Sequence, residues 1–168
     1  MRPASRWVAP ALLAALLVAH GQMSLHRLRA QRLLWSVESR TIALLQTRSL
    51  TRQQIAAHLN ALADAERLDP SEVGIPTAIG GQHFLLGQTE AARTAYRRAR
   101  QLEPRPEILL NLGKLRLMEG QRRAAVVLIT RAVALDPWLK REVPAELLEP
   151  VLDALRSEYR PDGADEDG

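Results

Sequence analysis

Apolar residues recur three or four positions apart along most of this chain, which is the spacing of amphipathic helices. Over residues 24–47, leucine, isoleucine and valine alternate with arginine and glutamate in this way. Thr51 followed by Gln54 is the signature of a capping box, and it predicts a helix over residues 51–68 that ends at Pro70. The pattern therefore predicts an all-α protein.

The second half of the chain repeats one pattern at an offset of 33 residues. The matching positions are Gly80, Gly87, Ala92, Tyr96, Ala99 and Pro104, then Gly113, Gly120, Ala125, Ile129, Ala132 and Pro137. Each set predicts a pair of helices, over 75–86 and 89–102 and then over 106–118 and 122–135. Gly87 and Gly120 follow the first helix of each pair, where a left-handed residue commonly ends a helix. A period of this length is typical of stacked helical hairpins.

The N-terminus carries a different pattern. Arg2 and Arg6 precede an uncharged run over residues 7–19, which is the layout of an export signal. Extended to Leu25, the run just approaches the ~20 residues of a membrane span. We expect residues 1–23 to be an uncleaved signal anchor, with the repeats on the exported side of a membrane. A cleaved signal and a buried helix of a soluble protein are the alternatives.

The rest of the chain divides by its patterns. Residues 24–70 form an amphipathic helix and a degenerate first repeat, and residues 71–137 form two clear repeats. After Pro137 the repeat phase is lost, and residues 138–160 are predicted to form a capping helix that covers the last hairpin. Residues 161–168 carry four acids and no apolar anchor beyond one alanine, so we expect a disordered tail.

The composition and the motifs exclude several kinds of functional site. Aromatic residues are 4% of the chain, the formal net charge is +4 and cysteine is absent, which excludes disulfides and cysteine-ligated metal. The histidines have no metal-ligand spacing, and no nucleophile motif or phosphate-binding loop appears. The basic residues show no recognition motif for nucleic acid. We therefore expect no enzyme activity, cofactor, metal, nucleic acid or small-molecule substrate.

Two segments, residues 78–104 and 109–137, share the turn glycine, the alanine of the second helix, the bulky residue four later and the closing proline. With these marks the chain resembles the tetratricopeptide repeat (TPR) family, in particular its membrane-anchored bacterial members. It departs from the family at Pro76 and Leu109, where a large aromatic is usual, and at His83 and Arg116, where a tyrosine is usual. The resemblance implies a right-handed superhelix of helical hairpins that binds proteins or peptides.

In this family the first helix of each hairpin lines the concave groove. The resemblance therefore implies a partner-binding face made of Thr77, Gly81, Phe84, Leu85, Leu110, Asn111, Lys114, Leu117 and Met118. Flanking helices that cover part of this face are the alternative. A second candidate surface is the stripe of Arg93, Arg97 and Arg100, which suits an acidic partner or anionic lipid. A solvated outer face is the alternative for this stripe.

These observations together predict a non-enzymatic scaffold for protein interactions, tethered to the membrane of the cell envelope, that binds a peptide or helix of a partner. The alternative is a structural accessory subunit of a larger membrane complex, in which the repeats only pack against other subunits.

Overall fold

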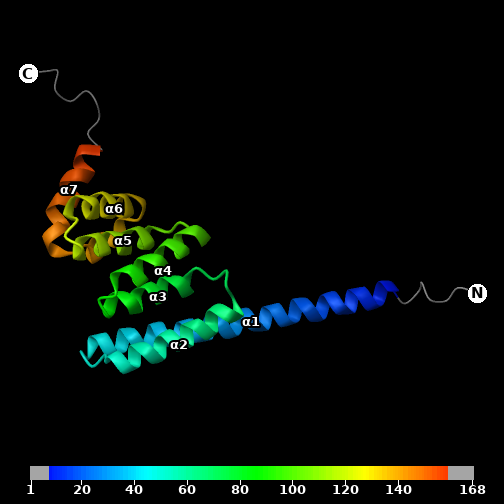
Figure 1. Cartoon of the computed structure of the whole chain (residues 1–168). Helices are drawn as coiled ribbons and strands as arrows, with labels where there is room; N and C mark the ends of the chain where they lie inside the picture. Colours follow the sequence, from blue (N-terminus) through cyan, green and yellow to red (C-terminus); the bar gives the residue numbers. More distant parts are fainter. Residues whose placement is uncertain (1–7, 159–168) are drawn as a thin grey trace, which may run out of the picture. The chain divides into compact units, whose positions relative to one another are not determined.

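The computed structural model describes residues 8–158, and these form helices without a strand. The elements in order are α1 (Val8–Gln46), α2 (Arg52–Leu68), α3 (Gly74–Leu85), α4 (Thr89–Leu102), α5 (Pro106–Met118), α6 (Arg122–Leu135), the 3₁₀ helix η2 (Pro137–Glu142) and α7 (Ala145–Glu158) (Figure 1). The chain divides into two compact units, Met1–Ala78 and Ile79–Gly168, so that α3 begins in the first and ends in the second. The all-α prediction is confirmed for the described residues.

The first unit is built on a hairpin of α1 and α2. Ala30, Leu34 and Val37 of α1 and Ile55 and Leu62 of α2 are buried, so one stripe of each helix forms the core of the hairpin. The predicted capping box is present at the start of α2, because the Gln54 side chain accepts from the Thr51 N–H and the Thr51 hydroxyl accepts from the Gln54 N–H.

Buried polar groups of this hairpin are paired across the two helices. The Thr41 hydroxyl of α1 lies 3.1 Å from Nδ1 of His58 on α2, and both side chains are buried. A buried polar group without a partner costs free energy, so this contact favours a single register of α1 against α2. Burial, with a smaller contribution from the nearby Glu72 carboxylate, raises the pKa of Glu38 on α1.

The predicted membrane anchor over residues 1–23, with the repeats on the exported side, is wrong for the described part of this segment. Among residues 8–158, no helix is long and apolar enough to cross a membrane. The apolar run ends at Ala19, and residues 20–22, a histidine, a glycine and a glutamine, follow within α1, so the apolar stretch falls short of ~20 residues. Residues 1–7, with the arginines of the predicted signal, lie outside the described residues.

The second unit contains the predicted hairpins, in which the end of α3 pairs with α4, and α5 pairs with α6. The turn glycines have positive φ, 72° at Gly87 and 74° at Gly120. After them, the N–H of Gln88 donates to His83 O and the N–H of Gln121 donates to Arg116 O, at 2.9 and 2.8 Å. These are the bonds of a Schellman motif, so the 33-residue offset repeats the backbone geometry as well as the residues.

Within each hairpin, a glycine of the first helix lies against the bulky residue of the second. A Cβ placed on Gly80 would lie 2.6 Å from the Tyr96 ring, and one on Gly113 would lie 2.5 Å from Cγ1 of Ile129. Tyr96 and Ile129 are buried, as are the repeated alanines of α4 and α6. The missing Cβ therefore lets the two helices approach closely enough for the bulky side chain to fill the gap.

The C-terminal segment covers the last hairpin. Leu147 and Val151 of α7, together with Leu139 of η2, share one buried cluster with Leu110 of α5 and Ile129 of α6. The capping helix predicted over residues 138–160 thus corresponds to two elements, because Asp136 accepts from the Trp138 N–H and starts η2 before α7. The predicted acidic tail, residues 161–168, lies outside the described residues.

The contact between Gly80 and Tyr96 predicts opposite effects at two neighbouring glycines. Gly80→Ala should lower the free energy of unfolding by about 1–2 kcal/mol, because the cost of overpacking exceeds the gain in helix propensity. Gly81→Ala should raise it by up to ~1 kcal/mol, because the nearest atom to a Cβ there is the Tyr96 hydroxyl at 3.9 Å. Urea unfolding followed by circular dichroism measures both. Equal midpoints for the two variants would contradict the close approach.

Candidate functional site

The face that the sequence predicts as a partner-binding groove is only partly exposed. Thr77 belongs to the first unit, and its hydroxyl donates to Val73 O at 2.8 Å. In the second unit, Leu85 of α3 and Met118 of α5 are exposed. Gly81, Phe84, Asn111 and Leu117 are half-buried.

The C-terminal segment engages the remaining two residues of this face. Leu110 is buried in the cluster shared with η2 and α7, and Leu117 packs against the same cluster. Lys114 Nζ lies 3.4 Å from the Glu142 carboxylate of η2. The exposed residues of this face are thus Leu85 and Met118.

A cleft of about 150 Å³ lies among α4, α5 and α6. We name it the arginine cleft, and its lining is Arg93, Arg97, Arg100, Leu112, Leu115, Arg116 and Leu128. Leu112 and Leu115 are buried, Leu128 is half-buried, and Arg97 and Arg100 are exposed. The lining therefore joins an aliphatic floor to a cationic rim, and the stripe predicted from the sequence is one wall of it.

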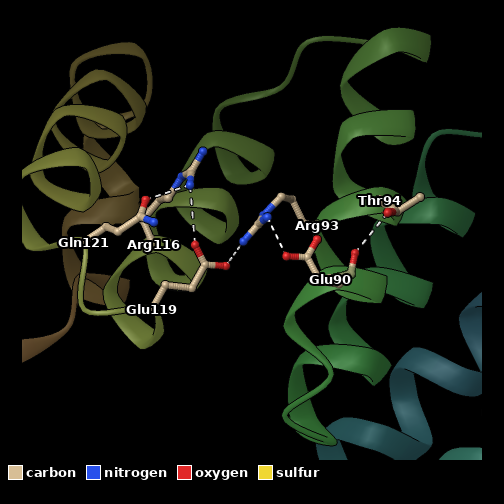
Figure 2. Close-up of polar contacts among 6 residues, drawn as sticks. All are labelled: Glu90, Arg93, Thr94, Arg116, Glu119 and Gln121. Atoms are coloured by element: carbon tan, nitrogen blue, oxygen red, sulfur yellow. Dashed lines mark hydrogen bonds and ion pairs between the residues drawn. The ribbon is translucent and has the colours of Figure 1, made fainter.

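Glu119 occupies the junction between the two hairpins at one end of this cleft. Its carboxylate accepts from Arg93 of α4 and lies 3.4 Å from the Arg116 guanidinium of α5. Figure 2 shows Arg93 between Glu119 and Glu90, which is 2.8 Å away, with Arg116 on the other side of Glu119. Arg116 also donates to the Gln121 side chain at 2.7 Å. Two of the four arginines are therefore held by one carboxylate of their own chain.

The hydrogen bond from Arg93 to Glu119 also raises the pKa of Arg93, with a smaller contribution from Glu90. Arg93 thus stays charged at neutral pH. Arg97 and Arg100 differ from it. Within residues 8–158, neither has a carboxylate partner. The uncompensated positive charge of the cleft therefore lies on the α4 side, at these two residues.

Arg116, Glu119 and Leu128 were missed as site residues by sequence reasoning. Arg116 stands where the resembled family has a tyrosine, and this departure was the one signal for it. The other two are brought to the cleft only by the packing of α5 and α6 against α4, which no spacing within one helix reveals. In the part of the chain that the structure describes, no three histidine or acidic side chains group closely enough to hold a metal ion.

The two carboxylates that contact Arg93 predict a contrast in stability. Glu119→Gln should lower the melting temperature by roughly 4–8 °C, because the Glu119 side chain is 14% exposed and holds two arginines. Glu90→Gln should change it little, because the Glu90 side chain is 80% exposed. Thermal unfolding followed by circular dichroism compares the two, and a larger loss for Glu90→Gln would show that Glu119 is not the link between the hairpins.

Comparisons with known proteins agree with this architecture. No protein-family model matches the chain, and no curated protein matches it. Among solved structures, the chain is similar to a thermophilic TPR protein of Thermus thermophilus, with a TM-score of 0.58 and 23% sequence identity. The match covers 89% of this chain and 78% of that one. The chain therefore has a TPR-like fold of stacked helical hairpins.

Proposed function

We propose that this chain is a non-catalytic scaffold that holds a peptide or helix of a partner protein at the arginine cleft. The observation that carries the proposal is the pair Arg97 and Arg100, exposed beside an aliphatic floor and without a carboxylate partner among the described residues. Unneutralised charges of one sign beside a concave surface attract and orient a partner of the opposite charge. Stacked hairpins commonly serve as binding surfaces of this kind.

The exposed part of the predicted groove is the second candidate contact surface. Leu85 and Met118 offer apolar contacts there, and methionine adapts its shape to different partners. Lys114 is already paired with Glu142, and Leu110 is covered, so this surface has fewer free groups than the arginine cleft. We therefore rank the arginine cleft first.

Capture of a partner by matched variants tests the proposal. The full chain, immobilised as bait, should lose at least about nine-tenths of a captured partner in Arg97→Gln/Arg100→Gln, because two charge contacts of ordinary strength together account for about a tenfold change in affinity. Lys114→Ala/Met118→Ala should capture the partner as the parent chain does. Quantitative mass spectrometry of the eluates measures all three.

The control keeps the same change of net charge elsewhere. Arg123→Gln/Lys140→Gln removes two exposed cations that do not line the arginine cleft, and it should leave capture unchanged. Circular dichroism establishes that every variant is folded. Loss of capture only in Lys114→Ala/Met118→Ala would show that the partner binds at the predicted groove. An equal loss in the control would show that capture depends on net charge and not on the arginine cleft.

A further inference from the structure

We infer that the occupant of the arginine cleft is an acidic peptide segment in which one aliphatic side chain lies between carboxylates. This inference rests on the proposed function and specifies the partner chemistry. It follows from three properties of the cleft, which are the free cations, the aliphatic floor and the size.

The free cations set the number and place of the acidic groups. Arg97 and Arg100 are separated by three positions on α4, so their Cβ atoms lie roughly 5–6 Å apart on one helix face. Guanidinium groups form paired hydrogen bonds with carboxylates. Arg93 and Arg116 are already paired with Glu119, so they contribute positive charge near the cleft but no free hydrogen-bond donors for the occupant's carboxylates. The occupant therefore places its carboxylates along the α4 wall.

The floor and the volume set the rest of the occupant. Leu112, Leu115 and Leu128 present only aliphatic carbon, so a polar group inserted among them would lose its hydrogen bonds to water. A volume of about 150 Å³ is well below the ~300–1,000 Å³ of pockets that bind drug-sized ligands. It has room for about one side chain. The occupant therefore inserts a leucine-like side chain and keeps its charges at the rim.

The lining also distinguishes a peptide from other anions. Proteins that bind single-stranded nucleic acid stack its bases on aromatic side chains, and among residues 8–158 no aromatic residue lines the arginine cleft. The chain's own residues 161–168 are acidic, but their apolar side chains are Pro161 and Ala164, and neither is a leucine-like side chain that would fill the floor. A segment of another protein that carries both carboxylates and a leucine-like side chain fits the cleft better than a nucleic acid or the chain's own tail.

Fluorescence anisotropy with designed probes tests this chemistry. The probe is a short fluorescein-labelled peptide with a central leucine flanked by aspartates and glutamates, titrated with the full chain. Arg97→Gln/Arg100→Gln should weaken binding about tenfold, and so should a serine in place of the probe's leucine. Asparagine and glutamine in place of its acids should abolish binding, and added salt should weaken it. Arg123→Gln/Lys140→Gln should bind within about twofold of the parent chain, since single exposed charges contribute little.

Each contrary result has a distinct meaning. Equal affinity for the leucine and serine peptides overturns the aliphatic requirement. Tighter binding of a single-stranded oligonucleotide than of the leucine peptide, lost in Arg97→Gln/Arg100→Gln, overturns the peptide assignment in favour of a phosphate ligand. Binding that is seen only after residues 161–168 are deleted identifies the chain's own tail as the occupant. If no peptide binds while partner capture still depends on Arg97 and Arg100, the scaffold proposal survives and only the partner chemistry fails.

Discussion

The second unit depends on the close approach of two helices at a glycine. Gly80 against Tyr96, and Gly113 against Ile129, leave no room for a Cβ, so each hairpin holds its helices at one separation and one rotation. The buried alanines of α4 and α6 lie on the same faces and keep the approach close along the helices. Each hairpin therefore packs against its neighbours with its two helices in one fixed arrangement.

The electrostatics of the cleft follow from the packing of α4 of one hairpin against α5 of the next. Because α4 is held against α5, a carboxylate at the end of α5 lies within reach of an arginine from each helix, and Glu119 serves both. A half-buried arginine needs such a partner to offset its desolvation. Arg97 and Arg100 project into solvent and need none for folding. The same helix thus presents one arginine that is part of the structure and two that are available to another molecule.

The sequence predicts an element correctly where residues close together along the chain determine that element. The turn glycines, the capping box at Thr51 and the bounds of α4, α5 and α6 depend on residues within one turn of the helix, and the structure has them as predicted. The contribution of Arg116 to the cleft depends on contacts between elements, and a single sequence carries little of that information. The 3₁₀ helix η2 begins at a local contact, in which Asp136 accepts from the Trp138 N–H, and the sequence prediction took no account of it. The membrane anchor failed because a short apolar run was extended across polar residues that simply continue α1. The arginine stripe was visible as a spacing, but its aliphatic floor was not.

The way the C-terminal segment closes the repeats has a consequence for assembly. An uncovered last hairpin would present an apolar surface shaped to receive the first helix of another repeat, and copies joined head to tail through it would grow without limit. Here Leu147 and Val151 of α7 occupy that surface from within the same chain. Because α7 covers the apolar surface of the last hairpin, a second copy cannot stack on that surface, and the chain does not polymerise through it.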